Sequence, residues 1–274
     1  MAVRMGQIEY INVLPIYYPI TEGIVPSNLE TVKGTPAELN ELMTAGDLDI
    51  ASCSSIEYAR NPDKYYLVPD LAIGSCGPVQ SVILLSAKPI KELEGETILV
   101  SAQTHTSAAL LKILMARKYK VNVSFHTGKA TEILATGARP PAILAIGDEA
   151  LRLRDHKDYP ILLDMGEEWR QWTDLPFIFG VWIAQKSSVE KSPKDLRQAA
   201  RALVSAKEWG KENIDSICQI AEKRCCQSKE QMKSYFDGLV YDLGEREKLG
   251  LMKFIEYLHE EGMIDQVAPL HFLD

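Results

Sequence analysis

The chain has 274 residues, of which 46% are hydrophobic, and it carries a formal net charge of −8. This length and composition predict a globular protein with a full hydrophobic core, built as one large domain or two smaller ones. No block of basic residues interrupts the acidic balance, which argues against nucleic acid and anionic membranes as partners. An anionic ligand would gain nothing from the overall charge, so local donors must hold it.

The first twenty residues do not follow the pattern of a secretory signal, because Arg4, Glu9 and Asn12 interrupt what would have to be an apolar core. No run is long enough to span a bilayer, and we expect a cytoplasmic protein. The cysteines are odd in number and lack C-x-x-C spacing, which predicts reduced structural thiols rather than disulfides. They are Cys53, Cys76, Cys218, Cys225 and Cys226.

The first ninety residues alternate between predicted strands and helices. Thr35, Pro36 and Glu38 form a capping-box pattern that predicts a helix start, and Gly46 is typical of a helix end. The predicted strands cover residues 3–10, 29–33 and 48–51, and the predicted helices cover 14–23, 36–46 and about 55–61.

A second unit begins with a strand at 81–86 and ends with a β-rich run that returns the chain to the first unit. Further predicted strands cover 97–101, 121–125, 142–146 and 177–184, with helices at 108–118 and 147–153. From Ser192 onward the apolar residues recur at helical spacing, and Ser228 with Gln231 forms another capping box.

This order predicts an α/β fold of two lobes joined by two strand-like crossings, with a central ligand cleft between them. Residues 1–86 and 185–274 are predicted to form the first, discontinuous lobe with its C-terminal helices, and residues 87–184 the second. Periodicity alone is also compatible with one doubly wound sheet.

Polar residues follow the predicted strands of the first unit directly. Asn12 stands where an apolar strand runs into a helix, and Ser54 and Ser55 stand at the same point of a later strand. Such residues cap helices, and they also face small anions at the strand ends of open α/β sheets. Both interpretations stay open, since a capping region at a cleft also faces the ligand.

Three further clusters are candidate ligand contacts. Gln80 and Ser81 follow a Gly-Pro turn at a predicted lobe crossing. They are interpreted either as donors to a bound carboxylate or as part of an ordinary loop. Thr106 and Ser107 belong to a hydroxyl-rich helix start that suits an anion or serves as redundant capping. Gly147 and Asp148 follow a buried strand, as a cap or as a contact from the opposite lobe. His105, in the second cluster, is the one histidine in a plausible site, and such a histidine is more often exposed than catalytic.

Several catalytic motifs are absent from the sequence. It contains no G-x-G-x-x-G, G-x-x-x-x-G-K-[ST], G-x-S-x-G or H-E-x-x-H pattern, and His259 and His271 lack metal-ligand spacing. We therefore predict no metal site, and no pattern suggests a cofactor.

Four ordered blocks resemble one known family, the menaquinone-biosynthesis chorismate dehydratases of the futalosine route. The resemblance runs from about residue 3 to about residue 184. Its densest blocks are Tyr10-Ile11-Asn12-Val13-Leu14-Pro15, Gly77-Pro78-Val79-Gln80-Ser81-Val82, residues 49–58 and residues 101–111. The resemblance implies a cytoplasmic enzyme with the type II periplasmic-binding-protein fold. Its reaction would be loss of water from chorismate to give 3-(1-carboxyvinyloxy)benzoate.

The resemblance also implies roles for the residues singled out above. It places the key catalytic role on Asn12, whose neutral carboxamide is a very poor base and is expected to position the substrate by hydrogen bonds. Substrate donors are expected from both lobes: Ser54, Ser55, Gln80, Ser81, Thr106 and Ser107, with Gly147 and Asp148 as further contacts. No arginine lies inside these motifs, so neutral donors must hold both carboxylates.

Two alternatives of other classes remain. One is a non-catalytic solute-binding protein of the same fold. The other is the dihydroxynaphthoate synthase of the same pathway, a family with a different N-terminal block and a catalytic histidine. The block around Asn12 favours the dehydratase. The oligomeric state is unknown.

Overall fold

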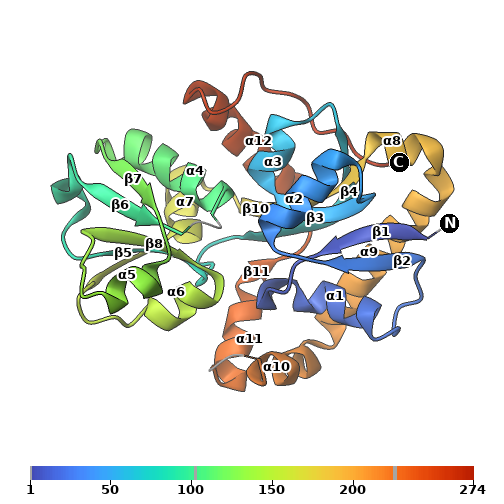
Figure 1. Cartoon of the computed structure of the whole chain (residues 1–274), viewed down its shortest axis with the longest axis horizontal. Coiled ribbons are helices and arrows are strands. Elements are labelled where there is room, and N and C mark those ends of the chain that lie inside the picture. Colours follow the sequence, from blue (N-terminus) through green and yellow to red (C-terminus); the bar gives the residue numbers. More distant parts are fainter. Residues whose placement is uncertain (1, 102–103, 225–226) are drawn as a thin grey trace.

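The computed structural model describes residues 2–101, 104–224 and 227–274, which fold into two α/β lobes lying side by side (Figure 1). One sheet runs through each lobe. The sheet of the first lobe has six strands in the spatial order β11-β4-β10-β3-β1-β2, and that of the second has five in the order β7-β6-β8-β5-β9. The prediction of two lobes is thereby confirmed, and a single doubly wound sheet is excluded.

The strands and helices have the following bounds. The strands are β1 (Val3–Gln7), β2 (Leu29–Lys33), β3 (Ile50–Ser54), β4 (Tyr65–Ser75), β5 (Val82–Ser86), β6 (Thr97–Val100), β7 (Ser124–Thr127), β8 (Ala142–Ile146), β9 (Ile161–Asp164), β10 (Phe177–Gln185) and β11 (Leu239–Val240). The α-helices are α1 (Leu14–Thr21), α2 (Pro36–Ala45), α3 (Ser55–Arg60), α4 (Thr106–Ile113), α5 (Ala130–Ala135), α6 (Gly147–Leu153), α7 (Met165–Thr173), α8 (Lys186–Lys191), α9 (Pro193–Glu212), α10 (Ile214–Glu222), α11 (Lys229–Asp237) and α12 (Glu245–Glu260). Two 3₁₀ turns, η1 (Ile11–Val13) and η2 (Ile90–Leu93), and one π-helical turn, η3 (Leu114–Tyr119), complete the set.

The sheet pairing corrects the predicted lobe boundaries by one strand at each crossing. Residues 82–86 were expected in the first lobe, yet β5 pairs antiparallel with β8 and β9 of the second sheet. Residues 177–184 were expected in the second lobe, yet β10 pairs antiparallel with β3 and β4 of the first. The chain therefore crosses between β4 and β5 and again between β9 and β10. Apolar patterning reveals a strand but not the sheet in which it pairs.

Three strands were not predicted: β4, β9 and β11. The longest of them, β4, contains Pro69 and Asp70, and Asp70 has a left-handed backbone with φ of 53°. These two residues interrupt the strand pattern in the sequence. In the structure β10 on one side and β11 on the other keep β4 in the sheet.

The helix caps predicted from the sequence are present in the structure. Thr35 and Glu38 form the capping box of α2, Gly46 ends that helix in a left-handed conformation, and Ser228 and Gln231 form the capping box of α11. Helix α1 packs against α9, which crosses it closely because Gly210 lies against Pro15: a Cβ atom on Gly210 would stand 2.2 Å from the Pro15 carbonyl oxygen. The long helix α9 therefore packs against the start of α1, directly after the turn η1.

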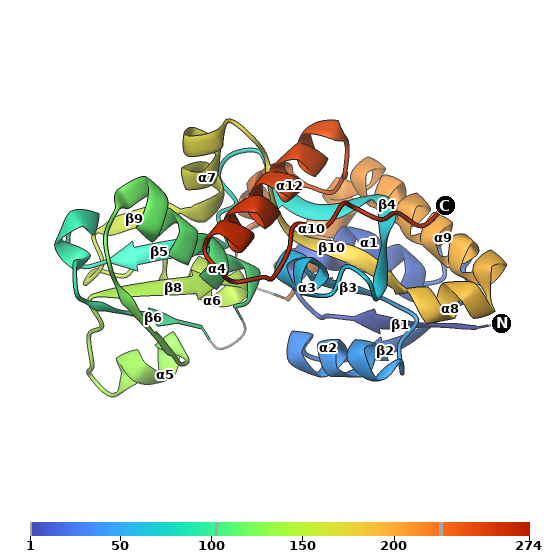
Figure 2. The same cartoon turned by 90° about the horizontal axis from the view of Figure 1, so that it is seen from above.

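Helix α12 ties the two lobes together on one side (Figure 2). It packs on β10 of the first lobe and on α4 of the second. At its end, Glu261 pairs with Nε of Arg117 at 2.5 Å, and Glu260 pairs with the same guanidinium. Trp169 of α7 packs edge to face against Phe177 and Phe254 across the same junction.

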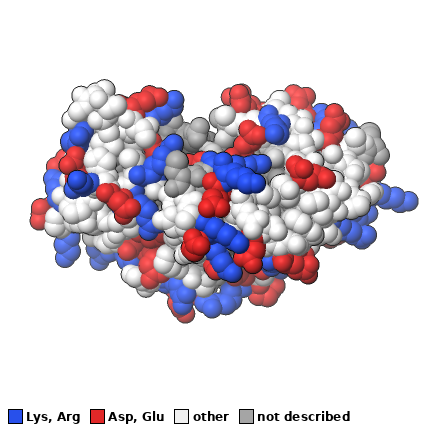
Figure 3. All heavy atoms as spheres, turned by 90° about the horizontal axis from the view of Figure 1, so that it is seen from below, with Lys and Arg blue, Asp and Glu red and all other residues white. Residues whose placement is uncertain are grey.

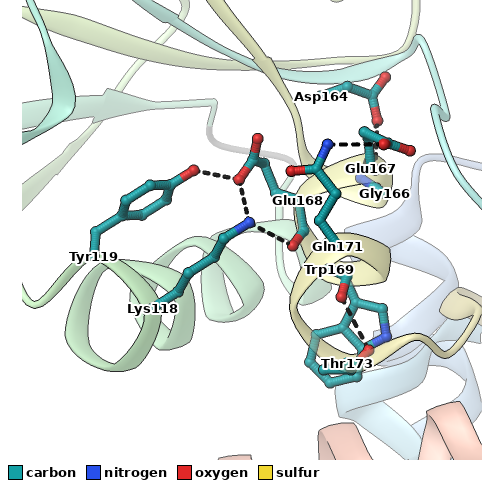
Figure 4. A network of polar contacts seen from close by, with 9 residues as sticks. All are labelled: Lys118, Tyr119, Asp164, Gly166, Glu167, Glu168, Trp169, Gln171 and Thr173. Atoms are coloured by element: carbon teal, nitrogen blue, oxygen red, sulfur yellow. Dashed lines mark hydrogen bonds and ion pairs between the residues drawn. The ribbon is translucent and has the colours of Figure 1, made fainter.

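Helix α7 is fixed within the second lobe by buried polar contacts (Figure 4). The side chain of Glu168 is turned toward Lys118, whose Nζ lies 2.5 Å from its carboxylate, and toward the hydroxyl of Tyr119. Burial and this carboxylate raise the pKa of Tyr119, which keeps it a hydrogen-bond donor.

Within the described part of the chain, every helix is too short or too polar to cross a lipid bilayer.

Candidate functional site

A cavity of about 160 Å³ lies between the two lobes and is lined by residues of both. Seven of the predicted site residues line it: Asn12, Ser54, Ser81, Thr106, Ser107, Gly147 and Asp148. They come from five separate segments of the chain, which the two sheets bring together at their facing ends. Ser55 and Gln80, which were also predicted, are not among the lining residues.

Asn12 occupies the middle of the 3₁₀ turn η1, between the buried side chains of Ile11 and Val13. Its capping interpretation is not supported, because the N-cap of α1 is Val13 and neither turn receives a side-chain capping bond from a described residue. The main-chain carbonyl of Asn12 accepts a hydrogen bond of 2.8 Å from the hydroxyl of Tyr241. Its side-chain Oδ1 is buried and accepts no hydrogen bond from any described residue. Buried amide oxygens are normally paired, so an Oδ1 without such a partner among the described residues, on a residue that lines the cavity, marks Asn12 as a candidate ligand contact.

Ser54 and Ser55 lie next to each other but have different surroundings. Ser54 stands at the end of β3 and lines the cavity, and its buried Oγ makes no hydrogen bond within the described chain. Ser55, the first residue of α3, is fully buried and donates through Oγ to the carbonyl oxygen of Ile178 in β10 at 2.6 Å. Its side chain thus holds α3 against the sheet and, unlike Ser54, does not line the cavity.

Gln80 and Ser81 belong to the first crossing between the lobes. The backbone of Gln80 is left-handed, with φ of 62°, and its side chain reaches α11, where Nε2 donates to the carbonyl oxygen of Ser234 at 3.0 Å. The Gln80 side chain is therefore bonded to α11, and the residue does not line the cavity as predicted for a substrate contact. Ser81 is 4% exposed and lines the cavity. The hydroxyl of Tyr235 in α11 donates to Ser81 Oγ at 3.0 Å.

The carboxylate of Asp164 holds this crossing in place. It accepts hydrogen bonds from the backbone N–H groups of Val79 (2.9 Å) and Gln80 (2.6 Å) and from those of Gly166 and Glu167 at the start of α7. Burial raises the pKa of Asp164 even though these four N–H groups oppose the shift. One side chain thus caps α7 and shapes the strained turn that presents Ser81.

The second lobe contributes the starts of α4 and α6. Thr106 Oγ1 accepts a hydrogen bond of 3.3 Å from the backbone N–H of Ile56 in the first lobe, so the hydroxyl of one lobe satisfies a helix N-terminal donor of the other. Gly147, with φ of 55°, donates through its N–H to the carbonyl oxygen of Ser81 at 2.7 Å. Asp148 and His105 are exposed at the cavity.

Sequence reasoning missed several lining residues that lie within strands or late helices. Trp182 of β10 pairs with Ser52 of β3, and both line the cavity, as do Cys53 and Tyr235. Ser52 Oγ accepts a hydrogen bond of 2.8 Å from Tyr17, whose pKa burial raises to about 12. Burial also raises the pKa of the Cys53 thiol, which keeps it protonated. A buried strand residue gives no sequence signal that distinguishes a cavity wall from core.

The cavity is poor in charge. Among the described residues, no lysine or arginine lines it, and its charged or titratable side chains near the entrance are Asp148 and His105. Burial raises the pKa of Tyr10 in the first lobe, and the negative charge of Asp148 across the cavity adds to this effect. On the face shown in Figure 3, basic and acidic side chains are interspersed over both lobes. A bound anion would therefore be held by neutral donors.

Cys53, Cys76 and Cys218 form no disulfide with one another, and Cys225 and Cys226 lie outside the described residues. Within the described ranges, no three His, Cys, Asp or Glu side chains gather as metal ligands would.

Two lobes with a ligand cavity at their junction define a binding-protein-like class, and solved structures of that class resemble the chain along nearly its whole length. A protein from Archaeoglobus fulgidus matches with a TM-score of 0.72 and 21% identity, covering 96% of this chain and 98% of the other. The periplasmic aliphatic sulphonate binding protein of Escherichia coli matches with a TM-score of 0.68 and 13% identity, covering 97% and 94%. The predicted periplasmic-binding-protein-like fold is thus confirmed.

The chain belongs to the menaquinone biosynthesis family, whose profile matches residues 3–260. It is 27% identical to the chorismate dehydratase of Thermus thermophilus, covering 93% of this chain and 94% of the relative. It is also 27% identical to the chorismate dehydratase of Campylobacter jejuni, covering 92% and 95%. The 1,4-dihydroxy-6-naphtoate synthase of Thermus thermophilus is 25% identical over 74% of each chain.

Proposed function

We propose that this protein is a chorismate dehydratase, a hydro-lyase that removes water from chorismate to give 3-(1-carboxyvinyloxy)benzoate. The observation that carries the proposal is a pair of buried side-chain oxygens, Asn12 Oδ1 and Ser54 Oγ, which belong to residues lining the interlobe cavity and have no hydrogen-bond partner among the described residues. Buried polar atoms are normally paired, so a polar ligand is expected to pair with these. Family membership and the two dehydratase relatives support this choice of ligand.

The substrate is a dianion, and the cavity suits it through neutral donors. Ser54 and Ser81 line the cavity from the first lobe and its crossing, and Ser107 lines it from the second, so their hydroxyls are the donors we assign to the carboxylates. Hydrogen bonds from neutral groups to a carboxylate are charge-assisted and stronger than neutral pairs. The low-polarity surroundings strengthen them further.

In the proposed reaction, the ring loses the hydrogen at C3 and the hydroxyl at C4 and becomes aromatic. The substrate's own enolpyruvyl carboxylate takes the C3 proton, the C3–H electron pair forms the new ring double bond, and the C4–O bond breaks. The proton leaves with the departing hydroxyl as water, so no other reactant is consumed. An intramolecular base held in place has a very high effective molarity, which makes a protein base unnecessary.

Asn12 has a positioning role in this scheme. A carboxamide is too weak a base to take the ring proton, but it offers one acceptor and two donors. From its fixed turn it would orient the leaving hydroxyl and the neighbouring carboxylate. We assign the reaction to the futalosine route of menaquinone biosynthesis, in the cytoplasm.

The test is incubation of the purified protein with chorismate, followed by ultraviolet absorbance and product mass. The expected result is loss of one water and appearance of a benzoate chromophore without added metal or cofactor. A protein that binds chorismate and returns it unchanged would instead be a solute-binding protein of the same fold.

The dihydroxynaphthoate synthase is the second candidate, because His105 lines the cavity and that family is expected to use a histidine. His105 is exposed at the entrance, whereas Asn12 lies half-buried within the cavity wall. Incubation with a cyclic futalosine, the substrate expected for the synthase, separates the two candidates, and we expect no product from it.

A further inference from the structure

Helix α11 is attached to the turn that presents Ser81 by two hydrogen bonds. Gln80 Nε2 donates to the carbonyl oxygen of Ser234, and the hydroxyl of the next residue, Tyr235, donates to Ser81 Oγ at 3.0 Å. The two bonds join adjacent residues of the helix to adjacent residues of the turn. Gly238, just after α11, keeps the contact close, since a Cβ atom there would stand 3.1 Å from the carbonyl oxygen of Pro78.

The backbone of Ser81 is already fixed by other contacts. Its N–H donates to the carbonyl oxygen of Val79 at 2.7 Å, and its own carbonyl oxygen accepts the N–H of Gly147 at the same distance. Asp164 holds the two preceding N–H groups. The bond from Tyr235 is therefore not needed to place the backbone of Ser81. Its effect is to orient the side-chain hydroxyl of Ser81.

A serine hydroxyl has one proton to donate and two lone pairs that accept. When Tyr235 donates into Ser81 Oγ, the Ser81 proton must point to another acceptor. The acceptor within its own turn is the Val79 carbonyl oxygen at 3.4 Å, which is the outer limit for such a bond. Donation into an O–H group also polarises it and strengthens its own donation.

We propose that Tyr235 is a positioning residue that makes Ser81 a hydrogen-bond donor toward an anionic oxygen of the bound substrate. This inference rests on the proposed function for the identity of that substrate. In the ligand-free cavity the Ser81 proton rests on Val79. A carboxylate or departing oxygen takes it over, because an anion is the stronger acceptor. The C-terminal helices thus act on the cavity through a residue of the first crossing, more than 150 positions earlier.

The experiment is a double-mutant cycle with wild type, Ser81→Ala, Tyr235→Phe and the double variant. Tyr159→Phe is the matched control, since Tyr159 is also buried and donates to a carbonyl oxygen, that of Pro140, away from the cavity. Each protein is measured for kcat/KM with chorismate and for affinity toward the benzoate product by calorimetry. Ser81→Thr, alone and with Tyr235→Phe, retains a hydroxyl and tests the conservative change.

We expect Tyr235→Phe to lower kcat/KM about tenfold and Ser81→Ala to lower it somewhat more. The double variant should be no slower than Ser81→Ala, while Ser81→Thr should remain sensitive to Tyr235→Phe. Tyr159→Phe should match wild type. The proposal would be overturned if the two losses in kcat/KM multiply in the double variant, or if Tyr235→Phe has the kcat/KM of wild type.

The product-binding cycle separates this inference from the proposed function. A wild type that binds the product but does not convert chorismate would refute the dehydratase. Non-additive losses of product affinity would then still support the role of Tyr235, and additive losses would reject it. A wild type that neither converts chorismate nor binds the product rejects both.

Discussion

The two lobes contribute different kinds of groups to one cavity. The first lobe offers Asn12 and Ser54, whose side-chain oxygens are buried and have no partner in the described chain. The second lobe offers Thr106, whose hydroxyl is already bonded across the junction to Ile56, and Gly147, whose N–H is bonded to Ser81 at the end of the first crossing. From this difference we infer that the first lobe supplies the groups that act at the reacting atoms, while the second lobe contributes Ser107 as a binding donor and holds the cavity closed.

The strongest test of this division is Asn12→Ala. The side chain makes no capping bond to a described residue, so its loss should leave thermal stability nearly unchanged. Loss of a fixed hydrogen-bonding group at the reacting atoms should lower kcat by about a hundredfold or more. Steady-state turnover of chorismate, together with thermal unfolding, measures both effects.

Asn213→Ala is a suitable control, because Asn213 is half-buried in the same lobe and donates to the carbonyl oxygen of Trp209, away from the cavity. It should keep normal turnover. A folded Asn12→Ala protein with near-normal turnover would remove the chemical role from the first lobe. Asn12→Asp keeps the shape and should bind chorismate more weakly, because it sets a carboxylate against a dianion.

Thr106→Val tests the second lobe. It keeps the volume but leaves the Ile56 N–H without the acceptor it has across the junction, which weakens the closed arrangement. We expect KM to rise about tenfold with kcat little changed, corresponding to about 1.4 kcal/mol.

Thr173→Val is the matched control, since Thr173 Oγ1 also accepts a backbone N–H, that of Leu175, outside the cavity. It should leave KM as in wild type. A fall in kcat rather than a rise in KM for Thr106→Val would mean that the second lobe also acts at the reacting atoms.

His105→Ala should have a smaller effect. His105 is exposed at the cavity entrance and is not required as a base when the substrate supplies its own. Turnover should therefore stay within about tenfold of wild type, whereas loss of a general base usually costs about a hundredfold or more. A greater loss with intact binding would favour a histidine mechanism and the dihydroxynaphthoate synthase.

The smallest expected effect is that of Gly147→Ala. Gly147 has φ of 55°, where an alanine costs about 1 kcal/mol of stability. Gly137→Ala is the matched control, since its φ is 88° and nothing lies within 4 Å of a Cβ atom at either glycine. Both variants should lose similar stability by thermal unfolding, but only Gly147→Ala should raise KM, by about threefold. Equal KM values would show that the start of α6 does not contact the substrate.

The local parts of the fold were predictable from the sequence. Thr35 with Glu38 and Ser228 with Gln231 were expected to begin helices and do so, because a capping box satisfies helix N-terminal donors within four residues. Strand β4 was not predicted, because Pro69 and Asp70 break its pattern and distant strands keep it in the sheet.

The candidate site was predictable as a set of strand ends but not residue by residue. Seven of the nine predicted residues line the cavity, while Ser55 and Gln80 bond to Ile178 and Ser234 instead. Trp182 and Tyr235 line it without any local signal, since a buried tryptophan in a strand and a tyrosine on a helix are typical of core.

The sequence by itself determined the family, the two-lobed α/β class and the strand ends that carry polar residues, because these depend on patterns a few residues long. The tertiary structure decided which sheet received β5 and β10, and which side chains face the cavity. Ser55 meets Ile178 across 123 positions and Ser81 meets Tyr235 across 154. Such contacts depend on strand pairing and helix packing between distant segments, which local periodicity does not encode.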